Sequence, residues 1–246
     1  MSPLRGVITD IHGNTVALDA VLADAASLGV GRWFVLGDLV AVGPDPVGVV
    51  ERLQSLPNAT FVRGNTERYL TATDIDKHGM AWTRSVLGPA RLDWLARMPL
   101  HARPSDRTLL VHAAPGRDDG VGLDARLGDE QVHVLVRGCE ADLVLVGHTH
   151  RRVDRTVGGV RVVNPGSVGN AIEHDLCAGW AVVDGDDIEL RRVAYDRAAV
   201  IAQAEASGNP VIDGIVAHLR GERIFTDQPL DVDVHEFEAP LEAKRA

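Results

Sequence analysis

The sequence predicts an α/β fold, and three observations carry the prediction. Short apolar runs alternate with segments of helical spacing over the first third of the chain. Each of these runs ends in a short stretch of glycine, aspartate or asparagine, as strands in open α/β sheets end in polar loops. Two later stretches have the pattern of β-hairpins. We therefore expect alternating strands and helices, followed by antiparallel strands.

The first third should form three strands and two helices. The first helix has Asn14 or Gly13 as its N-cap and Gly29 as its end. Asp45 suits the N-cap of the second helix, because Pro46 then takes the first helical position. The strands are expected at residues 4–9, 33–36 and 59–62.

The middle of the chain adds strands and helices of the same kinds. Two apolar strands are expected at 108–111 and 143–146, and two helices at 81–98, which Pro89 interrupts, and 129–139. Short glycine-containing turns then join two pairs of strands into hairpins. The pairs are 153–157 with 160–163, and 180–183 with 188–193. We expect these hairpins to build a second sheet that packs on the first.

The C-terminal fifth is expected to be less regular. Residues 197–221 resemble two small helices broken at 208–210, and the acidic stretch 222–246 has no periodicity and is expected to be a tail. Neither a repeat nor a linker divides the chain. We therefore expect a single domain spanning residues 1–246.

Composition and charge narrow the class of protein. The formal net charge is −10 and the chain has no lysine–arginine stripe, which argues against binding to a nucleic-acid duplex. No apolar run reaches the length of about 18 residues that a membrane span needs. Residues 1–5 lead directly into a strand without a secretion signal, and two cysteines form no disulfide framework. A cytoplasmic protein is expected.

Seven side chains that can bind metals follow the ends of five predicted strands. Together they supply four imidazoles, two carboxylates and an amide oxygen, which is enough for two divalent ions. A carboxylate has two oxygens and can join two cations, as we expect of the second aspartate. The seven are Asp10, His12, Asp38, Asn65, His112, His148 and His150.

Each of these residues also has a simpler interpretation when it is taken alone. Asp10 could cap the following helix, Asp38 and Asn65 could be turn residues, and His112 could be a buried core histidine. The pairs Asp10–His12 and His148–His150 are harder to dismiss, because residues i and i+2 of an extended segment point the same way. Only the ordered set of all seven favours a metal centre.

The ordered segments resemble those of the calcineurin-like metallophosphoesterase superfamily, from about residue 4 to 195. The pattern is Asp-x-His, Gly-Asp, Gly-Asn, a lone His and Gly-His-x-His; residues 37–46 and 164–169 point to the small bacterial and archaeal phosphodiesterase-like branch. The resemblance implies a four-layer αββα sandwich of two mixed sheets. It implies one metal on Asp10, His12, Asp38 and His150, and another on Asp38, Asn65, His112 and His148. It also implies that residues 164–169 buttress these ligand loops.

The implied activity is a phosphoesterase reaction with two divalent metal ions, for which manganese is favoured and iron, zinc, nickel and cobalt are alternatives. A hydroxide bridging the metals would attack a phosphodiester or phosphoanhydride in a small, nucleotide-like substrate. Asp38, Asn65 and His148 are the expected catalytic residues, and Asn65 and Thr66 the expected substrate contacts. A phosphomonoester or phosphoprotein phosphatase is the alternative within enzymes.

One departure from the family pattern bears on catalysis. Many members have a histidine where this chain has Thr66, and a threonine hydroxyl is a poor acid. The missing general acid could be His78, His101 or His174. Loss of acid help costs about two to four orders of magnitude for basic leaving groups, so acidic ones are favoured. A non-catalytic metal-binding scaffold remains the alternative of a different class.

Overall fold

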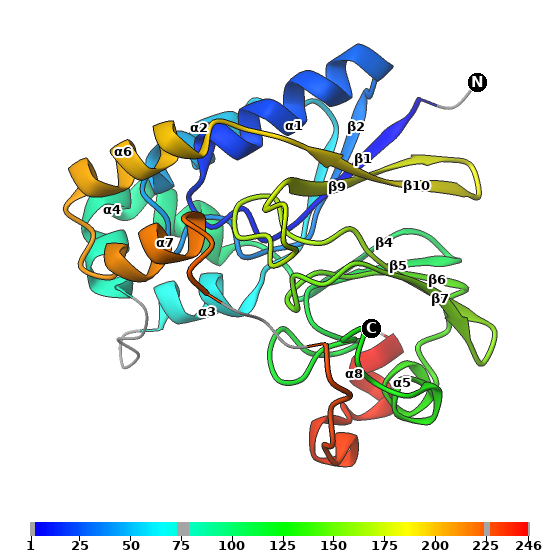
Figure 1. Cartoon of the computed structure of the whole chain (residues 1–246). Coiled ribbons are helices and arrows are strands. Elements are labelled where there is room, and N and C mark those ends of the chain that lie inside the picture. The colour runs from blue at the N-terminus through cyan, green and yellow to red at the C-terminus, as the bar shows by residue number, and fades with distance from the viewer. Residues whose placement is uncertain (1–2, 73–78, 224–226, 246) are drawn as a thin grey trace.

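The structure is a computed structural model that describes residues 3–72, 79–223 and 227–245 (Figure 1). It contains two five-stranded mixed sheets, with strand orders β10-β9-β1-β2-β3 and β4-β5-β6-β8-β7. The strands are β1 (Arg5–Ile8), β2 (Arg32–Val35), β3 (Ala59–Phe61), β4 (His101–Ser105), β5 (Thr108–Val111), β6 (Leu143–Leu145), β7 (Val153–Val157), β8 (Val160–Asn164), β9 (Ala178–Asp184) and β10 (Asp187–Val193).

Helices cover the outer faces of both sheets, which confirms the α/β sandwich (Figure 1). The helices α1, α2 and α4 pack on the first sheet, and α5 and η1 on the second. The helices are α1 (Thr15–Leu28), α2 (Pro46–Gln54), α3 (Asn65–Thr71), α4 (Met80–Ala96), α5 (Asp129–Val136), α6 (Arg197–Ser207), α7 (Ile212–Leu219), η1 (Val234–Phe237) and α8 (Leu241–Arg245). None of them is long and apolar enough to cross a membrane, within the described ranges.

A third apolar cluster holds the two sheets together. Val7 and Phe34 of the first sheet lie in one cluster with Leu110, Leu145 and Val163 of the second. All five side chains are buried. Burial of such side chains contributes about 1.5–3 kcal/mol each. The sheets are therefore fixed to one another, and so are the loops at the carboxyl ends of their strands.

The local signals for the first two helices are confirmed. The Asn14 side chain accepts a hydrogen bond from the N–H of Ala17 and caps α1, which ends at Gly29 in the left-handed conformation. The Asp45 side chain caps α2 by accepting from Gly48, with Pro46 in the first turn. Because Asn14 fills the cap of α1, Asp10 is not needed there.

The expectation that both hairpins build the second sheet is wrong for one of them. β9 pairs antiparallel with β1, so the β9–β10 hairpin extends the first sheet. Only β7–β8 joins the second sheet, beside β6. The burial pattern explains the difference, because Ala178–Val183 is buried on both faces, as an interior strand is. β7 is buried only at its ends, as suits an edge strand.

The segment expected to be a tail instead contains two short helical elements that pack on the second sheet. Val234 of η1 packs in the core of the second sheet. Lys244 of α8 is 1% exposed, and its ammonium donates to the carbonyls of Val134 and Arg137 at the end of α5. A cation favours the carboxyl end of a helix, where carbonyls lack partners. The missing periodicity reflects how short these two elements are.

Candidate metal centre

The loops that follow four strands meet at one point between the two sheets. In the first sheet, the N–H of Asp10 donates to Gly37 O at 3.0 Å and joins the loops after β1 and β2. In the second, Gly147 N donates to His112 O at 2.9 Å and joins the loops after β5 and β6. The N–H of His148 then donates to Asp10 Oδ2 at 2.9 Å. Both sheets thus supply side chains to one centre.

The first group of donor atoms joins the N-terminal part of the chain to its middle. His150 Nε2 lies 3.3 Å from Asp10 Oδ1 and 3.1 Å from His12 Nε2. His12 Nε2 lies 3.8 Å from both Asp10 Oδ1 and Asp38 Oδ2. Ligand atoms about 2.1 Å from a shared ion are expected to lie roughly 3.0–3.5 Å apart. The spacing of this group is therefore close to that of a coordination shell.

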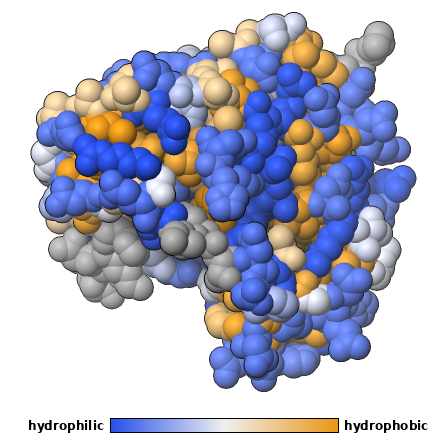
Figure 2. Space-filling model, in the orientation of Figure 1, coloured by the Kyte–Doolittle hydropathy of each residue, from blue (hydrophilic) through white to orange (hydrophobic). Residues whose placement is uncertain are grey.

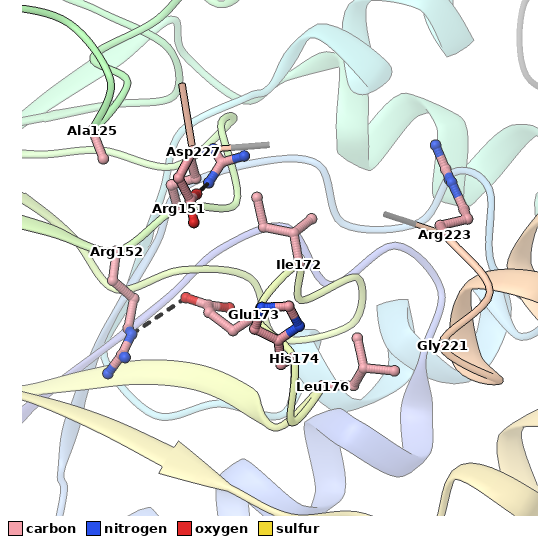
Figure 3. A pocket seen from close by; sticks show the side chains of 10 residues that line it. All are labelled: Ala125, Arg151, Arg152, Ile172, Glu173, His174, Leu176, Gly221, Arg223 and Asp227. Atoms are coloured by element: carbon pink, nitrogen blue, oxygen red, sulfur yellow. Dashed lines mark hydrogen bonds and ion pairs between the residues drawn. The ribbon is translucent and has the colours of Figure 1, made fainter. Parts of the chain in front are cut away.

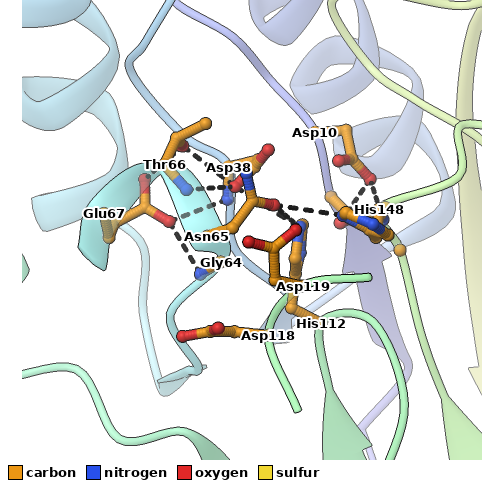
Figure 4. Close-up of polar contacts among 12 residues, drawn as sticks. Asp10, Asp38, Gly64, Asn65, Thr66, Glu67, His112, Asp118, Asp119 and His148 are labelled. Atoms are coloured by element: carbon orange, nitrogen blue, oxygen red, sulfur yellow. Dashed lines mark hydrogen bonds and ion pairs between the residues drawn. The ribbon is translucent and has the colours of Figure 1, made fainter. Parts of the chain in front are cut away.

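The second group gathers at Oδ1 of Asp38, and Figure 4 shows its side chains. His112 Nε2 lies 3.3 Å from Asp38 Oδ1 and 3.2 Å from Asn65 Oδ1. Asn65 Oδ1 also lies 3.1 Å from His148 Nδ1. All three side chains other than Asp38 come from loops or from the first residue of α3.

Asp38 is shared by the two groups, with one oxygen for each. Its Oδ2 faces His12 and its Oδ1 faces His112. The side chain is 6% exposed. The structure therefore brings together all seven residues predicted from the sequence. Each of the two groups contains four residues, and Asp38 belongs to both.

Each of the four imidazoles is held by a backbone carbonyl. The Nδ1–H groups of His12, His112 and His150 donate to Ala41 O, Leu36 O and Asn170 O. His148 is turned the other way, and its Nε2–H donates to Gly120 O at 2.8 Å. Because a neutral imidazole has one N–H, each ring presents a bare nitrogen to the centre. Such outer hydrogen bonds orient histidine ligands in metal sites.

The donor set fits cations, by two observations on the protein alone. Asp10 Oδ1 is buried and accepts no hydrogen bond from any residue that the structure describes. His12 Nε2 and His150 Nε2 lie 3.1 Å apart, so their lone pairs repel unless a proton or a metal ion lies between them. Buried charge without a partner is costly. Divalent ions would relieve both conditions.

The ionisation of the cluster follows from its carboxylates. Burial opposes the charged form of His112, but the Asp38 carboxylate raises its pKa to about 10. Burial likewise opposes charge on His150, whose pKa is nevertheless raised by Asp10. Burial and the neighbouring His112 lower the pKa of His148. The carboxylates thus attract positive charge to the centre, as they would attract a metal ion.

The backbone of five of these residues is in the left-handed region. The φ angles are 53° at Asp10, 47° at His12, 54° at Asp38, 68° at His148 and 58° at His150. The expectation that the i, i+2 pairs lie in extended segments is therefore wrong, although their side chains do converge. Non-glycine residues in this region cost of order 1 kcal/mol or more and cluster at functional sites.

Two motif glycines allow the close approach of these loops. A Cβ on Gly64 would overlap Oδ1 of Asp38, and one on Gly147 would overlap the hydroxyl of Thr9 and Oδ2 of Asp10. The glycine of Gly-Asn and that of Gly-His are thus required by packing around the two aspartates.

Thr66 binds the side chain of Asp38. It is 3% exposed, and its hydroxyl and N–H both donate to Asp38 Oδ1, at 2.9 and 3.0 Å. The hydroxyl proton is thereby engaged by a buried carboxylate. Thr66 therefore positions Asp38, and its contact with a substrate stays a prediction.

Glu67 is a site residue that the sequence reasoning missed. It is 1% exposed, and its carboxylate accepts from the N–H groups of Asp38, Leu39 and Gly64 at 2.8–2.9 Å. Burial and the charge of Asp38 raise its pKa to about 7. The signal was available, because a glutamate three residues after Gly64 fits a capping box for the start of α3.

A second missed set fixes His148 from behind (Figure 4). Arg68 binds Asp118 at 3.0 Å and Asp119 at 3.0 Å, and Tyr69 also donates to Asp119. Asp119 Oδ1 accepts from the N–H of Gly120, whose carbonyl holds His148. This set joins α3 to the loop before α5, and no local sequence pattern predicts this contact.

The three histidines considered as general acids lie in different parts of the molecule. His78 lies outside the described residues. His101 is half-buried on β4, and burial lowers its pKa. His174 lines a pocket that also contains Arg151, the residue after His150. Residues 164–169 do buttress the centre, since Ser167 Oγ donates to Asp10 O at 2.7 Å.

Comparison with known proteins settles the family. A family model described as the calcineurin-like phosphoesterase superfamily domain matches residues 4–187. The chain belongs to this superfamily. The resemblance read from the motifs is thereby confirmed, and membership implies a metal-dependent hydrolase of phosphate esters.

Relatives of this superfamily member cover nearly its whole length. An uncharacterized protein of Methanocaldococcus jannaschii is 30% identical, over 89% of this chain and 96% of its own. The crystal structure of a metallophosphoesterase from Sphaerobacter thermophilus is 25% identical, with a TM-score of 0.76 over 89% of this chain and 100% of that one. A hypothetical protein from Pyrococcus horikoshii OT3, 20% identical, shares the fold with a TM-score of 0.77 over 87% and 97%.

Proposed function

We propose that this protein is a binuclear metal-dependent phosphoesterase that hydrolyses a phosphodiester or phosphoanhydride in a small, nucleotide-like substrate. The position of Asp38 carries the proposal. Its two oxygens face two separate groups of N and O donors, at 3.8 Å on one side and 3.3 Å on the other. A single-metal site would have no use for two such groups.

The proposed division of ligands follows these contacts. Asp10, His12 and His150 would hold one ion and Asn65, His112 and His148 the other, with Asp38 between them. When bound, two divalent ions neutralise phosphoryl oxygens and supply an activated water. Nitrogen and oxygen donors suit Mn, Fe, Zn, Ni and Co, and we expect Mn.

The exposure of the ligands indicates where a substrate approaches. Asp10, His12, Asp38 and His112 are buried, whereas Asn65, His148 and His150 are partly exposed. The amide NH₂ of Asn65 is therefore the group that we expect to donate to a phosphoryl oxygen. His148 would contribute as a ligand, because its Nδ1 faces the centre and its Nε2–H is bound to Gly120 O. Asp38 would hold the two groups of donors in position relative to each other.

The chain itself favours substrates with a good leaving group. Thr66 is bound to Asp38, so the position after Asn65 offers no proton to a departing oxygen. Phosphoanhydrides and activated diesters leave without such help, unlike phosphoserine esters. This is the reason to prefer a diester or anhydride over a phosphoprotein.

A scaffold role finds less support on the surface. The large hydrophobic side chains that are exposed among the described residues are Leu28, Val86 and Leu241, on three different helices. Figure 2 shows one face on which hydrophilic residues dominate and hydrophobic ones form smaller groups between them. Scattered apolar residues are ordinary, and a docking surface usually has a contiguous patch.

The test is hydrolysis of bis(p-nitrophenyl) phosphate beside p-nitrophenyl phosphate by chelated protein resupplied with Mn²⁺. We expect diester turnover that needs the metal and falls at least about 100-fold in Asp38→Asn and His148→Ala. Arg107→Ala is the control, because this exposed side chain pairs with Asp142 at the opposite end of β5. Preference for the monoester would favour the phosphatase alternative, and absence of both metal and turnover would favour the scaffold.

A further inference from the structure

A pocket of about 360 Å³ is lined by basic side chains, among them Arg151, which follows His150 in the chain (Figure 3). Arg151, Arg152 and Arg223 line it together with His174, against two acidic residues, Glu173 and Asp227. Three arginines therefore face two carboxylates, in a chain whose formal net charge is −10. Such a hollow attracts anions.

The chain ties this pocket directly to the candidate ligands. Arg151 follows His150, so their Cα atoms are about 3.8 Å apart. On the facing wall, the carbonyl of Asn170 holds His150 Nδ1 at 2.8 Å, and Ile172 and His174 come within four residues of it. The residue that follows His150 and the segment that binds its ring therefore both line the pocket.

The acidic partners in the pocket differ in how firmly they hold the arginines. Asp227, which pairs with Arg151, has a side chain that is 85% exposed, while that of Arg151 is 12% exposed. Exposed ion pairs contribute about 0–1 kcal/mol, so an arriving anion can exchange with this carboxylate. The Glu173 side chain is more buried and pairs with both Arg152 and Arg192, so its negative charge is fully balanced.

A second basic hollow on the other side of the centre serves as a contrast. It is lined by Arg63, Arg68 and Arg117. There the Asp118 side chain is only 8% exposed and binds both Arg63 and Arg68 at 3.0 Å. A buried carboxylate shared by two guanidinium groups is not available for exchange. Of the two hollows, the one at Arg151 is the better anion site.

We propose that the pocket around Arg151 binds a second phosphoryl group of the substrate, next to the one that is hydrolysed. The inference deepens the proposed function and rests on it. It narrows the substrate class to molecules with two neighbouring phosphoryl groups, such as phosphoanhydrides. A guanidinium can bind a phosphoryl group through two parallel hydrogen bonds, which makes arginine suited to the role.

The test compares methylenediphosphonate, which carries two neighbouring phosphonate groups, with methylphosphonate, which carries one. Both are used as inhibitors of bis(p-nitrophenyl) phosphate hydrolysis by the Mn²⁺-loaded full chain. We expect Arg151→Ala to weaken inhibition by the diphosphonate about 10- to 100-fold and to weaken that by the monophosphonate much less. Arg107→Ala is the matched arginine control and should change neither constant. Any chelation of Mn²⁺ by the diphosphonate is the same for all variants.

A second variant separates binding from a structural role. Asp227→Asn removes the exposed carboxylate and should tighten diphosphonate inhibition up to about fivefold, since one negative charge no longer competes with the phosphoryl group for Arg151. A merely structural ion pair would give weaker inhibition in both variants. Equal losses for the two inhibitors in Arg151→Ala, or no loss for either, would overturn the second-phosphoryl site.

Failure of this inference and failure of the proposed function give different results. If the wild-type chain does not hydrolyse the diester, the proposed function fails. The affinities of wild type, Arg151→Ala and Asp227→Asn for methylenediphosphonate, measured by calorimetry, then still test whether the pocket binds the second phosphoryl group. If hydrolysis is normal and the variants bind the diphosphonate like wild type, only the pocket assignment is wrong.

Discussion

The Glu67 carboxylate accepts a hydrogen bond from the backbone N–H of Asp38 at 2.8 Å, so a buried acid at the start of α3 fixes the residue between the two donor groups. The same carboxylate binds Leu39 N and Gly64 N. The loop after β2 and the start of α3 are thereby locked together. Asp38 owes its orientation to this lock and to Thr66, which binds its side chain.

Replacement of Glu67 by glutamine should weaken this lock without changing the side-chain volume. A glutamine amide group has one oxygen, so at least one of the three N–H donors is left facing an NH₂ group. We expect Glu67→Gln to lower Mn²⁺ affinity about 10- to 100-fold and to cost about 1–3 kcal/mol of unfolding free energy. Metal titration and urea denaturation measure the two effects. Glu189→Gln, at an exposed glutamate of β10, is the control. Unchanged metal affinity in Glu67→Gln would show that Asp38 is held by other means.

Because the Thr66 hydroxyl donates to Asp38, we expect the rate of hydrolysis to depend steeply on the leaving group. Without an acid after Asn65, kcat/KM for aryl phosphodiesters should fall by about two to four orders of magnitude from nitrophenol to unsubstituted phenol. The measurement is a series of phenyl esters at one pH. A flat series would mean that another acid protonates the leaving oxygen. In that case His174→Gln, in the pocket beside Arg151, should restore the slope.

Close packing at Gly147 predicts a large effect from one methyl group. Gly147→Ala would press on Thr9 and Asp10, and overpacking of this kind costs about 1–3 kcal/mol. We expect at least about tenfold weaker Mn²⁺ binding, because Asp10 is displaced. Gly214→Ala is the control, since a Cβ there meets nothing within 4 Å. Equal metal affinity in the two variants would contradict the packing described here.

The buried His218 predicts part of the acid sensitivity of the fold. Burial and then the charge of Arg223 lower its pKa to about 4, against about 6.5 in an unfolded chain. Between these values the unfolded chain holds a proton that the folded chain does not, so stability falls as the pH falls from 6.5 towards 4. We expect the loss between pH 7.5 and 5 to be about 1–2 kcal/mol smaller in His218→Gln than in wild type.

Urea denaturation of chelated protein at the two pH values measures this difference. Chelation removes the metal, so that its own loss at low pH does not enter the comparison. His133→Gln, at an exposed histidine of α5, should show the wild-type dependence. The same loss in His218→Gln and wild type would show that the histidine is not buried in its neutral form.

The seven candidate ligands could be predicted from the sequence because each follows a strand end at short range. Asp10, Asp38 and His112 follow the last residues of β1, β2 and β5 by at most three positions. The carboxyl ends of strands in packed sheets converge, so these side chains meet. The residues that orient them were harder to predict. Asp119 positions His148 through Gly120, and the partners of Asp119 lie on α3, about fifty positions earlier.

The sheet membership of the last hairpin depended on tertiary pairing rather than local pattern. A hairpin signal fixes which strands pair with each other but not which sheet they join. The run Ala178–Val183, buried on both faces, was the one clue that β9 lies inside a sheet. The packing of η1 and α8 likewise depends on a few individual contacts, among them those of Val234 and Lys244, that no periodicity reveals.

We propose that two metal ions bind on either side of Asp38. The most direct test is a crystal structure of the Mn²⁺-loaded protein with anomalous scattering recorded for manganese. We predict two peaks about 3.5–4 Å apart, one near His12 and His150 and the other near Asn65, His112 and His148, with an Asp38 oxygen on each. A single peak, or peaks that leave Asp38 on one ion only, would contradict the binuclear centre.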